Sequence, residues 1–419
     1  MVSLRSLFGK DADVLRDRDF QLLLLASITS PLGASLLSPV LDSLTGPFGV
    51  GEARIGLLMA VYTAPAIVMI PVAGVLADRY GRKPVLIAGL TLFGAAGTAI
   101  AAVDDFRIVL VLRLLQGIAY TGIGPILITS VGDLYQGAQE ATAQGLRFTM
   151  VGVSMTVMPL LSGLLVVIAW QYPFVLYAIA LPSAVLVFLG FEEPTSIDEG
   201  NETDRDRREH IRDLVGLIRQ PRVFAILFGR TVPSFLWFGF LTYNSIVVVR
   251  LLGGTPGQAG ALVALSSIAS SIAATQVGRL TDVFATRVVP LIGGVSLAGA
   301  GLVLLPFVPS IPWLAVCVLG MGFGFGVMIN MFRSMITGFA PEQLRGGLVS
   351  VGESIGRLGS TSAPIIMGGA IAVLEPSMGF ARALQVVLVA VGMIGVLAGS
   401  LAILVSDRSA TVYNPVAAD

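Results

Sequence analysis

Ionisable side chains stand inside long apolar stretches of this 419-residue sequence, and these side chains are the ones best placed to do chemistry. They are Arg113, Arg147, Arg230, Arg333, Glu353 and Arg357, with Asp42 and Asp133 nearer to the ends of such stretches. A charge at membrane depth costs about 3 kcal/mol or more unless it faces water or a partner, so each is a candidate for binding a proton or a charged ligand. The sequence has neither a nucleotide-binding P-loop nor a catalytic constellation, so we expect no covalent chemistry and no enzyme.

Glu353 is the single acid deep inside an apolar stretch, and Arg357 follows it by four residues. Residues four apart share one face of a helix and are able to pair. One interpretation is a self-neutralised pair packed between helices. The other is that Glu353 carries a proton whose binding is tuned by Arg357. Arg230 has no acid nearby in the sequence, so it either binds an anionic group or extends toward the membrane surface.

Aromatic and amide side chains collect in the same stretches as these charges. They are Tyr120, Phe235, Trp237, Phe238, Tyr243, Asn244, Phe323, Phe325 and Asn330. A cavity with such a lining suits a small amphipathic molecule, because ligand pockets combine apolar walls with a few polar groups. The alternative is that most of these side chains pack between helices.

The elements that must position these residues are apolar runs of membrane-spanning length. The sequence is 55% hydrophobic and 12% charged, against roughly 25% charged in soluble domains. About 20 apolar residues cross a hydrocarbon core as a helix. Twelve runs of this kind lie near residues 20–42, 55–77, 84–103, 106–132, 141–168, 172–191, 222–249, 257–280, 288–307, 311–338, 345–373 and 379–405. The sequence therefore predicts an all-α membrane protein with twelve transmembrane helices.

A single long polar segment divides the twelve runs into two sets of six. We predict an N-terminal six-helix bundle at residues 1–191, a cytoplasmic linker at 192–221 and a C-terminal six-helix bundle at 222–419. Within the linker, the pattern favours a short surface helix from Asp206 to Arg219, with the lone His210 solvated. The lone Cys317 lies in an apolar run, where it gives no metal or disulfide framework and is expected to be a packing residue.

The distribution of Lys and Arg predicts the orientation in the membrane. These residues concentrate before the first run, after the second and in the linker. The opposite side holds few: Arg54, Arg107, Arg250 and Arg382. Because Lys and Arg collect in cytoplasmic loops, both termini are predicted to lie in the cytoplasm. The formal net charge is zero, which gives no basic field for a nucleic acid, so none is expected as a partner.

The two sets of six runs also repeat one another. The stretch GVLADRYGRK from Gly74 aligns with GRLTDVFATR from Gly278 and places Asp78 on Asp282. Pro159 and Gly163 in the fifth run align in the same way with Pro364 and Gly368 in the eleventh. Internal symmetry of this kind is typical of secondary transporters built by duplication. We therefore expect two pseudo-symmetric halves.

Together these features resemble the major facilitator superfamily. The loop pattern G-x-L-a-D-r-x-G-r-k is matched from Gly74 to Lys83, and R-x-x-q-G is matched by Arg113, Gln116 and Gly117 in the fourth run. The resemblance implies two pseudo-symmetric six-helix bundles whose first, fourth, seventh and tenth helices line a central cavity. The second pattern is typical of proton-coupled exporters, in which Arg113 either takes part in coupling or forms a local hydrogen-bond hub with Gln116. The antiporter pattern of the fifth run is poorly met, since Met158 stands where a glycine is expected.

The resemblance also implies a conformational gate at the loop that joins the second and third helices. Gly74 is expected to permit close approach of helices, because glycine has no side chain. Asp78 is expected to pair with Arg82 at the end of the second helix. Family members place an acid of the fourth helix against this arginine, so Asp133 completes the predicted cluster.

The second half of the repeat keeps Asp282 but has Thr286 where the first half has Arg82. An aspartate at a helix end without a local partner needs a cation. We hypothesise that Asp282 contacts Arg147 across the two halves when the cavity faces outward, and that the contact opens when the cavity faces inward.

The sequence thus predicts a secondary transporter that moves a small organic solute by alternating access, most simply as a proton-coupled exporter. We expect a monomer without cofactor or metal in the lipid bilayer of a prokaryotic cytoplasmic membrane. The candidate substrate and coupling residues are Asp42, Arg113, Gln116, Tyr120, Arg230, Trp237, Tyr243, Asn244, Asn330, Glu353 and Arg357. Two alternatives stay open: uptake or exchange of an organic anion, and a membrane sensor or scaffold that does not transport.

Overall fold

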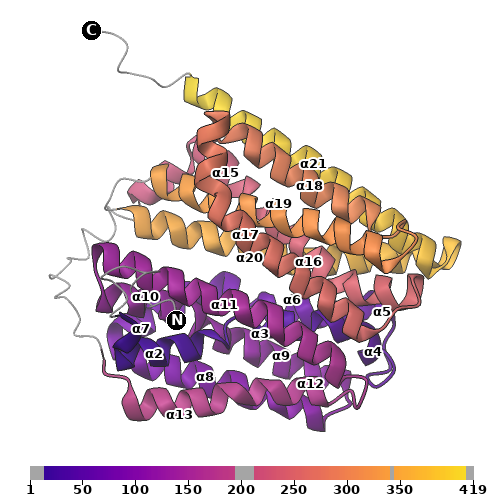
Figure 1. The fold of residues 1–419 in the computed structure, drawn as a ribbon, viewed down its shortest axis with the longest axis horizontal. Helices are drawn as coiled ribbons and strands as arrows, with labels where there is room; N and C mark the ends of the chain where they lie inside the picture. Colours follow the sequence, from indigo (N-terminus) through magenta and orange to yellow (C-terminus); the bar gives the residue numbers. More distant parts are fainter. Residues whose placement is uncertain (1–13, 194–211, 340–343, 412–419) are drawn as a thin grey trace, which may run out of the picture.

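Helices form all the regular structure in the residues that the computed structural model describes, which are 14–193, 212–339 and 344–411 (Figure 1). Eleven helical segments there are long and apolar enough to cross a membrane. One further helix, α18 (Val288–Leu304), is apolar and shorter, with 17 residues. These segments correspond to the twelve predicted runs, so the all-helical membrane fold is confirmed.

Six spans make up the N-terminal half, and most are broken into shorter helices. They are α2 (Arg18–Ser27), α3 (Leu32–Ser35) and α4 (Leu41–Leu44); α5 (Glu52–Ile55), α6 (Leu57–Thr63) and α7 (Ala66–Tyr80); α8 (Arg82–Ala99); α9 (Phe106–Thr121) and α10 (Gly124–Leu134); α11 (Gly137–Leu165); and α12 (Tyr172–Val175) and α13 (Ala180–Gly190). Pro31 and Pro39 lie at the breaks of the first span. Proline lacks a backbone N–H and clashes with the preceding turn, which explains these breaks.

The C-terminal half has longer, less interrupted helices. They are α15 (Pro221–Gly229) and α16 (Thr231–Ile246), followed by a π-helical turn (Val247–Leu251); then α17 (Pro256–Phe284), α18, α19 (Ile311–Phe339), α20 (Arg345–Met378) and α21 (Phe380–Thr411). Residues 212–218 of the linker are helical too, within the predicted surface helix. The first part of that helix, including His210, lies outside the described residues.

The two halves lie side by side with their helices running in the same general direction (Figure 1). We call one end of this assembly the linker end, because α13 ends and α15 begins there, together with the α7–α8 turn at Gly81. The other, where α4 is followed by α5, is the far end. The close contacts between the halves join α11 to α17 and α20 to α5, α6 and α7.

Glycines bring the two halves into backbone contact near the far end. A Cβ on Gly163 of α11 would lie 2.4 Å from the carbonyl oxygen of Pro256 at the start of α17. A Cβ on Gly368 of α20 would lie 2.4 Å from the carbonyl oxygen of Ala53 in α5. The internal repeat aligns Gly163 with Gly368, so these are two symmetry-related contacts. Any side chain at either position would push the halves apart.

Candidate functional site

A central cavity of about 290 Å³ lies between the two halves. Its walls come from α3, α6, α9 and α11 of the N-terminal half and from α16, α17, α19 and α20 of the C-terminal half, with Arg230 at the junction of α15 and α16. The charged side chains in its lining are Arg230, Arg333, Glu353 and Arg357. A solute held here would touch both halves at once, which is what a transport site requires.

Glu353 is held in the cavity wall by two arginines from other helices. Its carboxylate accepts a hydrogen bond of 2.9 Å from Arg333 Nη2 and one of 3.4 Å from Arg230 Nη2. Arg230 also donates to Ser234 Oγ at 2.9 Å and is only 4% exposed. Arg230 therefore has the acid partner that sequence proximity could not reveal, and its extension to the membrane surface is ruled out in this structure.

Arg357 does not form the predicted pair with Glu353. Its Nη2 instead donates to the hydroxyl of Tyr120 at 2.6 Å, and its guanidinium lies 4.8 Å from the centre of that ring. The two residues share a face of α20, but Glu353 is engaged by Arg230 and Arg333 while Arg357 reaches across to α9 of the other half. This contact joins the halves at the cavity.

Arg113 is a hydrogen-bond hub and does not line the cavity. It is fully buried and donates to the carbonyl oxygens of Gly33 at 2.6 Å and Leu58 at 3.0 Å. It also donates to Gln116 Oε1 at 2.8 Å, and its guanidinium lies over the ring of Tyr62. Gln116 donates onward to a backbone carbonyl of α8. Of the two interpretations for this residue, the hub is the one that these contacts match.

Some of the predicted aromatic and amide residues lie in the cavity wall and others pack away from it. Tyr120, Trp237, Phe238 and Phe325 line it, and the rings of Trp237 and Phe325 are stacked with their centres 4.3 Å apart. The others are not in its lining: Phe235, Tyr243, Asn244, Phe323 and Asn330.

The amides in particular bond to backbone. Asn244 donates to the carbonyl of Ala259 at 3.0 Å, and Asn330 donates to Gly326 in its own helix at 2.8 Å. These two side chains and Tyr243 therefore do not line this cavity, where they were expected. Sequence reasoning in turn missed Tyr62, Ser234 and Arg333 as wall residues. Arg333 was recognisable as a charge at membrane depth, whereas the other two carried no distinguishing signal.

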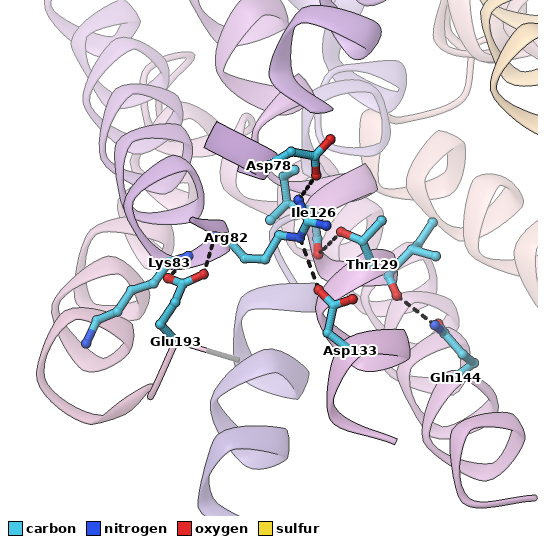
Figure 2. Close-up of polar contacts among 9 residues, drawn as sticks. Asp78, Arg82, Lys83, Ile126, Thr129, Asp133, Gln144 and Glu193 are labelled. Carbon is cyan, nitrogen blue, oxygen red and sulfur yellow. Dashed lines mark hydrogen bonds and ion pairs between the residues drawn. The ribbon is translucent and has the colours of Figure 1, made fainter. Parts of the chain in front are cut away.

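The linker end carries the predicted charge cluster (Figure 2). Arg82 pairs with Asp78, and its Nε donates to Asp133 Oδ2 at 3.0 Å. Glu193, which sequence reasoning missed, accepts hydrogen bonds from the backbone N–H groups of Arg82 and of Lys83, the latter at 2.8 Å. A carboxylate at the start of α8 is favourable because the first N–H groups of a helix lack partners.

One of the gate expectations fails, the one for Gly74. A Cβ on Gly74 would meet nothing within 4 Å, so this glycine does not mediate close approach of helices here. The close position is instead Gly81, whose φ of 96° favours glycine and whose missing Cβ makes room for Glu193.

Arg147 and Asp282 are not in contact in this structure. Arg147 is buried, its Nε donates to Gln144 at 3.0 Å, and its Nη2 has no hydrogen-bond partner. Asp282 is exposed on α17 at the linker end, and the described residues offer it no ion pair. The hypothesis assigns this contact to a state with the linker end closed.

Asp42 also lies away from the cavity, in an ion cluster at the far end. Arg250, in the π-helical turn after α16, donates to Asp42 at 2.7 Å and lies 3.3 Å from Glu52. The backbone N–H of Asp42 donates to Ser245 Oγ at 3.1 Å. Both acids belong to the N-terminal half and Arg250 to the C-terminal half, so this cluster ties the halves together outside the transport site.

The fold, the internal repeat and the charge cluster around Arg82 agree with the protein family whose model matches this sequence. A family model described as Major Facilitator Superfamily matches residues 23–364 and 234–418. The chain belongs to the major facilitator superfamily. The resemblance seen in the loop from Gly74 to Lys83 is thereby confirmed. As a member of the major facilitator superfamily, the protein is a membrane transporter and not an enzyme.

Named relatives within the major facilitator superfamily are exporters and resistance proteins. The chain is 35% identical over 150 residues to the "Bacillibactin exporter" of Bacillus subtilis (strain 168), which covers 34% of this chain and 37% of that protein. It is 24% identical over 355 residues to "Tetracycline resistance protein, class H" of Pasteurella multocida, which covers 81% of this chain and 86% of that protein.

Solved structures of the superfamily share the fold. A bacterial homologue of the human lysosomal transporter Spinster, described as inward-facing and unoccupied, superimposes with a TM-score of 0.79 at 18% identity. The superposition covers 99% of this chain and 100% of that one. A crystal structure of the nucleoside transporter NupG superimposes with a TM-score of 0.75 at 13% identity, covering 92% of this chain and all of that one.

Proposed function

We propose that this protein exports a small amphipathic organic solute across the cytoplasmic membrane of a prokaryote by proton-driven alternating access. The observation that carries the proposal is Glu353, a carboxylate in the wall of a cavity shared by both halves. Relatives named as exporters and resistance proteins favour the outward direction. The moving bodies would be residues 1–191 and 222–419 of a monomer, joined by residues 192–221, with both termini in the cytoplasm.

Alternating access in this proposal is a change in which end of the assembly is closed. The far end carries the Asp42–Arg250 pair and the backbone contacts at Gly163 and Gly368. Toward the linker end, the halves are joined by the Arg357–Tyr120 hydrogen bond, by Arg333 lying over the ring of Phe148 and by packing of α7 on α20. These observations support a state closed at the far end, which the predicted orientation places outside the cell.

Glu353 is the proposed proton carrier because it and its two ionic partners lie on three different segments of one half. When ionised, Glu353 of α20 pairs with Arg230, at the junction of α15 and α16, and with Arg333 of α19. A proton on this carboxyl would remove the charge that keeps both arginines in place. Protonation is thereby linked to the packing of the helices that form the cavity.

The test is transport by the full-length protein in proteoliposomes with and without an imposed pH gradient. Glu353→Gln keeps the shape of the side chain and removes its titration. We expect it to abolish gradient-driven accumulation and to spare downhill exchange. Glu375→Gln is the matched control, since Glu375 lies on the same helix outside the cavity lining. Gradient-driven transport that survives in Glu353→Gln would refute the assignment of the proton to this residue.

A further inference from the structure

The charges that line the central cavity do not balance. Arg230, Arg333 and Arg357 contribute three positive charges, and Glu353 contributes one negative charge. Glu353 pairs with Arg230 and Arg333, and the described residues offer Arg357 no carboxylate within ion-pair distance. The cavity wall therefore carries an excess of two positive charges.

Residues around the cavity do not correct this excess. Arg147 and Arg113 are both buried in the N-terminal half, and neither forms an ion pair in the described part of the chain. The acids of the spans are engaged elsewhere: Asp42 with Arg250 at the far end, and Asp133 with Arg82 at the linker end. Buried cations without counter-charge are costly, so a negatively charged ligand in this cavity would be stabilised.

Arg357 has the geometry for such a ligand. Its guanidinium lines the cavity, and among the described residues its hydrogen-bond partner is the neutral hydroxyl of Tyr120 at 2.6 Å. A guanidinium presents five N–H donors in a planar fork that matches the two oxygens of a carboxylate. Most of the donors of Arg357 are thus free of other side chains at the point where the two halves meet.

Another part of the cavity wall is aromatic and apolar. Trp237 and Phe325 stack there with an angle of 14° between their rings, and Phe238, Leu241 and Ile329 extend the surface. Aromatic faces of this kind hold the flat or aliphatic body of a ligand. The lining of the cavity therefore includes both an oxyanion-binding group and an apolar surface for the body of a ligand.

We propose that the substrate is an amphipathic organic anion, with its oxyanion group on Arg357 and its apolar body against Trp237 and Phe325. The proposal rests on the proposed function only in taking this cavity as the transport site. A cationic compound would meet two uncompensated positive charges in the same place. The charge of the wall thus selects against the cationic amphiphiles that the aromatic surface alone would accept.

Binding of three isosteric probes to the purified full-length protein tests the proposal: naphthoate, naphthylmethanol and naphthylmethylammonium, measured by equilibrium dialysis. We expect naphthoate to bind most tightly and the ammonium compound least. Arg357→Gln should weaken naphthoate binding by roughly 10-fold or more, the loss expected for a charge-assisted bidentate contact. The affinity of Arg357→Gln for naphthylmethanol should stay within about twofold of that of the unaltered protein, and this result would also show that the variant is folded.

Two further variants sharpen the test. Glu353→Gln removes the only negative charge of the wall, so naphthoate should bind more tightly to it than to the unaltered protein. Arg279→Gln is the matched control, since Arg279 is exposed on α17 and bonds to Gln276 rather than lining the cavity. Tighter binding of the ammonium probe than of naphthoate, or naphthoate binding unchanged in Arg357→Gln, would overturn the proposal.

The outcome separates this inference from the proposed function. If naphthoate binds selectively and its binding needs Arg357, but no proton-driven export is observed, the proposed substrate class stands and the proposed direction or coupling of transport is wrong. If the protein exports a neutral or cationic solute in a proton-driven manner and does not bind naphthoate, the proposed function stands and the proposed substrate class is wrong.

Discussion

The ion cluster at the far end gives the sharpest prediction about conformation. Arg250 joins the halves through Asp42 at 2.7 Å, and the Asp42 side chain is only 8% exposed whereas that of Arg250 is 47% exposed. A fully exposed pair contributes about 0.2 to 1 kcal/mol, and a hydrogen bond to a buried charge contributes about 1.5 to 3 kcal/mol. Half-exposure places this contact between the two, at about 1 kcal/mol, or roughly a fivefold change in the ratio of closed to open far end.

Asp42→Asn removes the charge and keeps the backbone N–H that donates to Ser245. Spin labels at positions 107 and 382, which are exposed at the far end of the two halves, report the opening as a distance distribution in a Cys317→Ser background. We expect the population with the longer distance to rise roughly fivefold.

A double-mutant cycle with Arg250→Gln distinguishes the contact from its surroundings. Arg250→Gln also removes the contact with Glu52, so if Asp42 acts only through Arg250, the double variant opens no further than Arg250→Gln alone. Additive effects, or an unchanged distance distribution in Asp42→Asn, would show that the backbone contacts close the far end without this ion pair.

Three other predictions follow from contacts between and within the halves. Gly368→Ala places a Cβ 2.4 Å from a backbone oxygen and should lower the midpoint of thermal unfolding measurably. Gly369→Ala is the control, because a Cβ there meets nothing within 4 Å, and equal unfolding midpoints for the two variants would contradict the contact. Arg82→Gln breaks both ion pairs at the linker end and should slow transport at unchanged expression, as measured in vesicles. Cysteines at 147 and 282 should crosslink only when the far end is open; crosslinking in both states, or in neither, would end that hypothesis.

Features that depend on local sequence were predictable here. The twelve helices follow from the lengths of apolar runs, because the bilayer permits few alternatives to a helix. The contact of Arg82 with Asp78 follows from a short loop that allows its charges little freedom of position, and the contact with Asp133 was expected from the resemblance to the family. The hydrogen-bond hub around Arg113 was one of two interpretations. It was open to prediction because Arg113 and Gln116 are three residues apart, which places both on one face of the helix.

Features that depend on the rotation of one helix against another were not predictable. Glu353 finds Arg230 and Arg333, which are 123 and 20 residues away, rather than the near neighbour Arg357. Spans that are apolar on all sides give little sign of which face lines the cavity, so Asn330 was assigned to it wrongly. The position of Arg250 depends on a π-helical turn that no residue pattern predicted.

The paired glycine contacts at the far end determine how abruptly that end opens. At Gly163 and Gly368 backbone lies directly against backbone, and no long side chain spans the interface there. Attraction between packed atoms falls steeply once a gap of 0.5–1 Å appears, so such a contact does not stretch as a flexible salt bridge does. Because the internal repeat places one contact on each side of the assembly, tilting one half against the other strains both together. If the far end opens in the proposed transport cycle, we therefore expect it to open in an all-or-none manner, without a stable half-open form.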